Sequence, residues 1–167
     1  MLLDLLAPPL CWSCAAPAVR GAQPSAADGR SGAGLCAACR RSLRFLGGGP
    51  ALLSGLAVWA PVAYDGPARE LVKALKFHAA IGIADEMAAL VAANAPPRLL
   101  TATLVPVPLH PARRRIRPFN QAELLARAIS ARAARVGPAL PIRDCLARTG
   151  PHAPLSPRSR GPAARLG

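Results

Sequence analysis

Apolar residues recur at the spacing of an amphipathic helix in three segments of the chain. The first segment begins at residues 65–67, where Pro67 suits the first helical turn because its missing N–H needs no partner there. The second segment follows Gly82, and the third begins at Asn120 and ends at Gly137. The expected buried faces consist of Leu71, Val72, Leu75 and Ala79, then Ile83, Met87, Leu90 and Val91, and finally Leu124, Leu125, Ala128 and Ile129.

Three other segments are apolar without helical spacing, and they predict strands. Residues 56–64 alternate weakly and indicate one or two short edge strands, residues 99–108 predict a buried strand, and residues 140–146 predict one more. The third helix has a clear start, because Asn120 can cap it and Glu123 follows three residues later. This order of helices and strands is typical of the start of an α/β unit.

Four cysteines in the first quarter of the chain form two Cys-x-x-Cys pairs with 21 residues between the pairs. Each tight turn can supply two thiolates of a tetrahedron with bonds of about 2.3 Å, so this spacing is typical of a Cys₄ zinc site. The expected ligands are Cys11, Cys14, Cys36 and Cys39. Four protein ligands leave no position for water, so we expect a structural zinc ion. Two disulfides or a redox-active pair are the alternatives. The distant Cys145 is expected to be a buried free thiol.

Zinc-bound thiolates favour a reducing compartment, so a cytoplasmic location is expected. Residues 1–10 are apolar, but they include Asp4 and lack a basic start, so they predict a short amphipathic helix rather than a signal peptide. No later run approaches the ~20 uninterrupted apolar residues that a membrane helix needs. The sequence therefore predicts no membrane partner.

The net charge of +13 is concentrated in the second part of the chain. Residues 98–167 hold 13 arginines against two carboxylates, Glu123 and Asp144. Such a segment favours polyanions, either DNA or a phosphorylated small ligand. A GC-rich coding sequence, which enriches Ala, Arg, Gly and Pro together, explains the excess equally well. Phe119 is the one aromatic residue of this segment, so the segment offers few side chains on which nucleic-acid bases could stack.

Three motifs resemble the ComF family. They are the paired cysteine knuckles, residues 64–77, and residues 104–121, which combine Val-Pro-Val-Pro with a basic loop and Phe-Asn-Gln. The resemblance covers residues 1 to about 148, and the motifs follow the family's order. That family is similar to type I phosphoribosyltransferases. Some members are linked to DNA uptake in natural competence, and others resemble amidophosphoribosyltransferases.

The resemblance implies a doubly wound sheet, here incomplete, with residues 104–117 near a pyrophosphate site. A loop that leads from a strand into a helix N-terminus offers backbone N–H groups to phosphate, and arginines add charge. The expected contacts are Arg113, Arg114, Arg117, Asn120 and Gln121. Pro118 stands where the family usually has glycine, so a left-handed conformation is lost there. A basic loop that is only solvated is the alternative.

The family's acidic pair and Thr-Thr-Gly loop, which bind the ribose and the 5′-phosphate of phosphoribosyl diphosphate, have no match in this sequence. Apolar periodicity ends near residue 149, which favours a frameshift or premature end. We therefore expect a zinc ribbon over residues 1–46, an incomplete phosphoribosyltransferase-like unit over residues 55–148 and a disordered tail over residues 149–167. Mg²⁺ and phosphoribosyl diphosphate are expected as ligands only of the complete family domain.

Three functions are compatible with these features. The first is a ComF-like phosphoribosyltransferase homologue, related to DNA uptake or nucleotide metabolism, that does not catalyse transfer as this chain. The second is a zinc-dependent nucleic-acid-binding module, whose affinity should fall steeply with salt. The third is an adaptor that binds proteins, such as those of the competence machinery.

Overall fold

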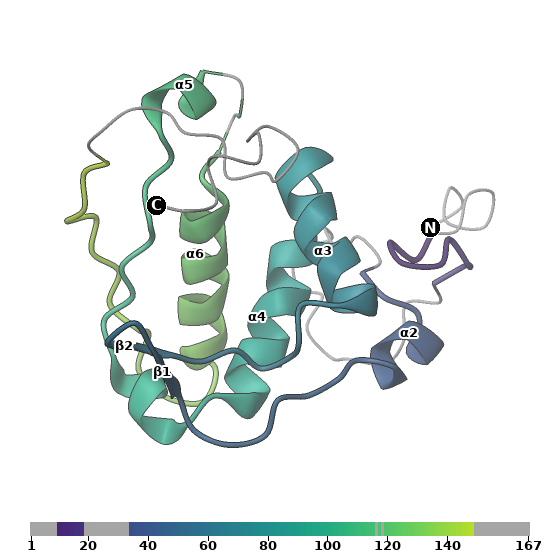
Figure 1. Cartoon of the computed structure of the whole chain (residues 1–167), viewed down its shortest axis with the longest axis horizontal. Coiled ribbons are helices and arrows are strands. Elements are labelled where there is room, and N and C mark those ends of the chain that lie inside the picture. Colours follow the sequence, from purple (N-terminus) through teal and green to yellow (C-terminus); the bar gives the residue numbers. More distant parts are fainter. Residues whose placement is uncertain (1–9, 19–33, 116, 118, 149–167) are drawn as a thin grey trace.

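The computed structural model describes residues 10–18, 34–115, 117 and 119–148 (Figure 1). It combines several helices with one small sheet, and it places four cysteines close together near the N-terminus. This mixture agrees with the expected α/β class. The elements are α2 (Ala37–Arg41), β1 (Ala51–Leu53), β2 (Leu56–Val58), α3 (Gly66–Phe77), α4 (Ile83–Asn94), the 3-10 helix η1 (Pro97–Thr101), α5 (Pro111–Arg114) and α6 (Gln121–Ala133).

The three helices expected from apolar spacing are present as α3, α4 and α6. Helix α4 packs against both α3 and α6, and Figure 1 shows it between them. Leu71 of α3 and Ile83 of α4 are the largest fully buried side chains among the described residues. The predicted stripes of α3 and α4 reach the core at Leu71, Leu75 and Ile83. The stripe predicted for α6 is only partly buried, and the buried residues of that helix are Ala126 and Ala133.

The expected buried position of Ala79 is wrong. Helix α3 ends at Phe77, and Ala79 is exposed in the left-handed conformation, with φ of 50°. The N–H of Ala80 then donates to the carbonyl of Ala74 at 3.3 Å, and the same carbonyl accepts from the N–H of His78 at 3.0 Å. The chain turns here to begin α4, so the helical periodicity stops earlier than the sequence indicates.

The sheet is an antiparallel hairpin of β1 and β2, in which Leu52 lies opposite Ala57. Ser54 and Gly55 join the strands, and both have positive φ, at 49° and 79°. Two such residues suit the right-handed twist of a tight hairpin. The sequence predicted a strand within residues 56–64 but missed β1, and all six strand residues are exposed.

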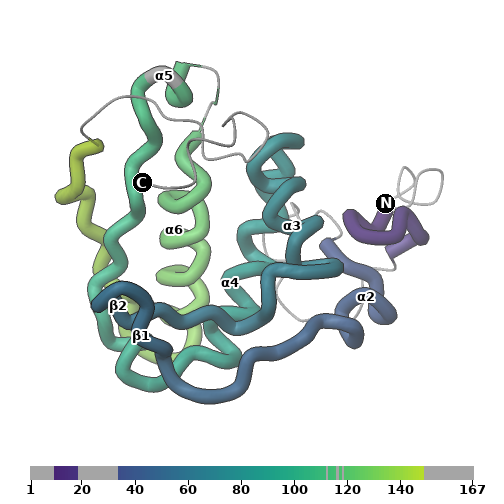
Figure 2. The backbone as a smooth tube through the Cα atoms, in the orientation of Figure 1, coloured from purple at the N-terminus to yellow at the C-terminus, as the bar shows by residue number. Residues whose placement is uncertain are grey.

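A parallel bridge joins Leu104 to Ile142, and α6 lies between them in the chain. The N–H of Leu104 donates to the carbonyl of Pro141 at 2.8 Å, and the N–H of Arg143 donates to the carbonyl of Leu104 at 3.0 Å. Figure 2 shows both extended segments on the same side of α6. Two parallel segments connected through a helix form the elementary unit of α/β folds.

The strands expected over residues 99–108 and 140–146 are wrong in extent. Residues 97–101 form η1 instead, because Pro97 begins a helical turn, and the two segments share a single bridge. Pro106, Pro108 and Pro141 have no N–H to donate, so a longer ladder cannot form beside them. Cys145 is correspondingly exposed rather than buried, because no strand covers this segment.

One hydrophobic cluster joins the cysteine segments to α3 and α4. Its buried members are Cys11, Ala18, Leu35, Leu43, Ala68, Leu71, Ala74 and Ile83. The division into residues 1–46 and 55–148 stays a prediction. The tail over residues 149–167 and, apart from Leu10, the helix expected over residues 1–10 lie outside the described residues.

Candidate metal centre and anion cleft

The first cysteine pair lies in a tight turn. The N–H of Cys11 donates to the carbonyl of Ala16 at 2.8 Å, and the N–H of Ala15 donates to the carbonyl of Cys11 at 2.9 Å. Ala15 has a φ of 57°, so the chain reverses directly after Cys14. This reversal brings both thiols of the pair to the same side of the turn, where they meet the second pair.

The second cysteine pair lies at the start of α2. Cys36 is the N-cap residue, and its Sγ accepts a hydrogen bond from the N–H of Cys39 at 3.5 Å. Cys39 lies inside the helix, so one helical turn sets the distance between the two thiols. The N–H of Trp12 donates to the carbonyl of Gly34 at 3.0 Å, which ties the first turn to the chain that enters the second pair.

All four Sγ atoms lie within 4.8 Å of one another, and those of Cys14 and Cys36 are 3.7 Å apart. A tetrahedron of thiolates with metal bonds of about 2.3 Å has edges of about 3.8 Å, so the arrangement fits a tetrahedral ion after a small contraction. All four cysteines are free, which differs from the alternative of two disulfides. The expected cysteines thus form a Cys₄ group positioned to hold a metal ion.

The thiols of this group differ in their ease of ionisation. Burial raises the pKa of Cys11, but N–H groups of Cys36, Cys14 and Ser13 outweigh it and lower that pKa to about 6. Burial and the three neighbouring cysteines raise the pKa of Cys39 to about 12, although Ser13 opposes the shift. Four neighbouring thiols cannot all lose their protons unless a positive charge compensates the four thiolates. The group therefore has the chemistry of a cation site.

A cleft of about 600 Å³ lies beyond the carboxyl ends of the two bridged segments, next to the start of α6. Residues that follow Leu104 and Ile142 form its walls. Ligands of open α/β sheets bind at this position, outside the carboxyl ends of parallel strands. Its polar lining consists of Arg114, Asn120, Glu123, Arg127, Asp144 and Arg148.

The structure separates the residues expected to contact phosphate. Arg114 and Asn120 line the cleft, whereas the guanidinium of Arg117 lies 5.4 Å from the ring centre of Phe77. Arg113 lies on α5, and Gln121 is the first residue of α6. The phosphate role of these five residues stays a prediction.

Sequence reasoning missed four of the five charged residues that line the cleft, which are Glu123, Arg127, Asp144 and Arg148. Arg127 donates to Glu123 Oε1 at 2.7 Å, and their spacing of four residues on a predicted helix was a usable signal. Asp144 and Arg148 follow Ile142 in the chain, and the pairing of Ile142 with Leu104 places their segment beside the cleft. No pattern in the sequence indicates that pairing.

Neither the family models, the curated proteins nor the solved structures contain a match to this chain. Within the described part of the chain, no helix combines the length and the apolar character needed to cross a bilayer. The features of this chain that bear on its function are therefore the cysteine group, the cleft and the motifs of its sequence.

Proposed function

We propose that this chain is a ComF-like protein with two parts. The first is a cysteine module, the two turns that carry Cys11, Cys14, Cys36 and Cys39, which binds zinc. The second is a phosphoribosyltransferase-like unit that binds a phosphorylated ligand. The observation that carries the proposal is the position of the cleft. It lies beyond two parallel segments, beside the start of a helix, and three arginines line it. Helix N-termini and arginines are both suited to phosphate oxygens.

Arg114 is the residue best placed to bind such a ligand, and Asn120 has a structural part. Arg127 is already paired with Glu123, whereas Arg114 lies on α5 at the rim of the cleft. Asn120 Oδ1 accepts from the N–H of Ala122 at 3.1 Å, and its Nδ2 donates to the carbonyl of Val107. Asn120 therefore fixes the extended segment against the helix start and shapes the cleft.

The 167 residues contain no Thr-Thr-Gly loop. That loop and its acidic pair bind most of the donor in the phosphoribosyltransferases that this chain resembles. We therefore expect this chain to bind pyrophosphate-containing ligands without transferring a phosphoribosyl group, since catalysis needs a complete set of positioned donors.

Calorimetric titration of the metal-loaded chain tests this function. Phosphoribosyl diphosphate and inorganic pyrophosphate should both bind, and Arg114→Gln should weaken binding about tenfold, because a charge-assisted hydrogen bond is lost. Arg98→Gln is the control, since Arg98 lies on η1 outside the cleft lining. Equal affinities of wild type and Arg114→Gln, or no binding by the wild type, would overturn the proposal.

Zinc is the ion that we propose for the cysteine group. Four thiolates in two Cys-x-x-Cys pairs suit Zn²⁺, and a closed Cys₄ set gives the ion a structural role. Elemental analysis of chain purified under reducing conditions should find about one zinc per molecule, and much less in Cys14→Ser, which keeps only three of the thiolates. Stoichiometric iron with visible absorption would instead indicate an iron–sulfur site.

Nucleic-acid binding is the second candidate, and the contact between Arg117 and Phe77 favours it. The Phe77 ring is two-thirds exposed with a guanidinium beside it, which is a surface suited to stacking on a single-stranded base. A labelled single-stranded oligonucleotide should then lose affinity with added salt and with Phe77→Ala. Affinity that is independent of both would exclude this mode.

A further inference from the structure

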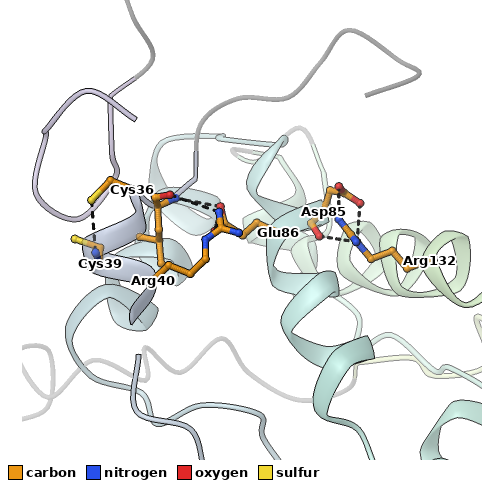
Figure 3. A network of polar contacts seen from close by, with 7 residues as sticks. Cys36, Cys39, Arg40, Asp85, Glu86 and Arg132 are labelled. Carbon is orange, nitrogen blue, oxygen red and sulfur yellow. Dashed lines mark hydrogen bonds and ion pairs between the residues drawn. The ribbon is translucent and has the colours of Figure 1, made fainter. Parts of the chain in front are cut away.

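Glu86, in the first turn of α4, reaches out of the helix toward the cysteine module (Figure 3). Its Oε2 accepts a hydrogen bond from the N–H of Leu35 at 3.1 Å, and its Oε1 pairs with Arg40 Nη2 at 2.7 Å. The Glu86 side chain is only 14% exposed. A carboxylate this far from water needs both partners to offset the loss of its hydration.

The two partners of Glu86 flank the second cysteine pair. Leu35 directly precedes Cys36, and Arg40 directly follows Cys39. Arg40 Nη2 also lies 3.5 Å from the carbonyl of Leu35, so the three residues close a ring of polar contacts. One carboxylate of α4 therefore fixes the chain on both sides of Cys36 and Cys39.

Gly34 allows this close approach. A Cβ atom added at Gly34 would lie 1.3 Å from Glu86 Oε2, so no side chain fits there while Glu86 holds its place. The carbonyl of Gly34 accepts the N–H of Trp12 at 3.0 Å. The short segment of Gly34 and Leu35 is thus held from one side by the first cysteine turn and from the other by Glu86.

The neighbouring carboxylate, Asp85, provides an internal comparison. Figure 3 shows Asp85 on the opposite side, where it pairs with Arg132 of α6 at 2.7 Å. Asp85 and Glu86 are adjacent acids on one helical turn, and each binds an arginine. Only Glu86 faces the cysteine module.

We propose that Glu86 is a positioning residue of the metal centre, which holds the second cysteine pair in the geometry that binds metal and couples metal binding to α4. The inference rests on the proposed metal binding by the Cys₄ group. The coupling is reciprocal: Glu86 is satisfied only when Leu35 and Arg40 are in place, so metal binding stabilises α4 as much as α4 favours metal binding. Outer partners that orient metal ligands typically change metal affinity about 10- to 100-fold when they are removed.

The test uses the full chain, with Co²⁺ as a spectroscopic probe and Zn²⁺ affinity measured by competition with a chelator. Glu86→Ala should bind both ions about 10- to 100-fold more weakly and shift the visible bands of tetrahedral Co²⁺–thiolate. Glu86→Gln keeps an acceptor for the N–H of Leu35, so it should recover part of this loss. Asp85→Asn, the matched control, should retain the affinity and spectrum of the wild type.

A second pair of variants keeps the test informative if Glu86→Ala does not fold. Arg40 is half-exposed, and Arg40→Gln removes its ion pair with Glu86 and its contact with the carbonyl of Leu35. This variant should weaken Co²⁺ binding several-fold, whereas the adjacent Arg41→Gln should not. Wild-type affinity and spectrum in Glu86→Ala, or in Arg40→Gln where Glu86→Ala does not fold, would overturn the role of Glu86. A wild-type chain that binds neither ion would overturn the metal proposal itself.

Discussion

Single residues decide whether the cysteine module can pack against α4, and Gly34→Ala is the clearest case. The new methyl group would collide with Glu86 Oε2 and displace the carboxylate from Leu35. A partly buried acid without its partner is costly, so we expect the metal-loaded chain to lose about 1–3 kcal/mol of unfolding free energy in urea. Gly47→Ala is the control, because its Cβ would meet nothing within 4 Å. Equal losses in the two variants would contradict this account.

Asn120→Ala tests the cap of α6. The variant loses the bond to the N–H of Ala122 and the bond to the carbonyl of Val107, so we expect a loss of about 1 kcal/mol in stability. Asn94→Ala is the control, because the exposed Asn94 side chain donates to the carbonyl of Leu90 within its own helix. Its loss should change the free energy of unfolding by less than about 0.5 kcal/mol. Urea unfolding of both variants measures the difference. A loss in Asn94→Ala as large as that in Asn120→Ala would argue against the cap.

The residues that sequence reasoning found share a local pattern. The cysteines have a spacing that metal chemistry imposes, and the Asn120 cap depends on atoms two residues apart. Gly34 and Glu86 have no such pattern, because the bond from Leu35 to Glu86 spans 51 positions. Cys145 was misplaced for the same reason: its environment depends on a strand pairing that the chain does not form.

At the scale of elements, the three long helices were predictable from the sequence, whereas the extents of the strands were not. The amphipathic spacing of α3, α4 and α6 follows from each helix's own sequence, and α4 packs against both of the other helices. A strand needs a neighbour whose backbone N–H groups can donate to it. Next to the bridge between Leu104 and Ile142, three residues lack that N–H: Pro106, Pro108 and Pro141. The hairpin strand β1 was missed because Ala51, Leu52 and Leu53 are all apolar, so the sequence shows no alternation there.

The contact between α4 and α6 gives a prediction at this scale. Arg132 of α6 binds both the carboxylate and the backbone carbonyl of Asp85, and its side chain is 17% exposed. Arg132→Ala should therefore cost about 1 kcal/mol, with Asp85 partly screened by solvent. Arg127→Ala on the same helix removes an exposed pair with Glu123 and should cost about 0.3–0.5 kcal/mol. Chemical denaturation compares the two, and the opposite order would mean that the interhelical contact contributes little.

For the whole molecule, the shared core predicts that metal removal acts beyond the cysteines. Cys11 and Leu35 pack with Leu71 and Ile83 of the helices, so the cysteine segments are part of the structure that buries α3 and α4. Metal bound only by the folded state stabilises everything that unfolds with the site. We therefore expect a chelator to lower helical circular dichroism as well as to disorder the cysteine turns.

Trp12 can report the cysteine turns in the same experiment, because its ring lies 5.9 Å from that of His78 just beyond α3. In the variant Trp59→Phe, the tryptophan fluorescence comes from Trp12 alone. If the chain is one cooperative unit, Trp12 fluorescence and helical dichroism change together as chelator is added, and zinc restores both. Fluorescence that changes while the helical signal stays constant would mean that the cysteine module unfolds separately, and that the cluster around Leu71 is stable without it.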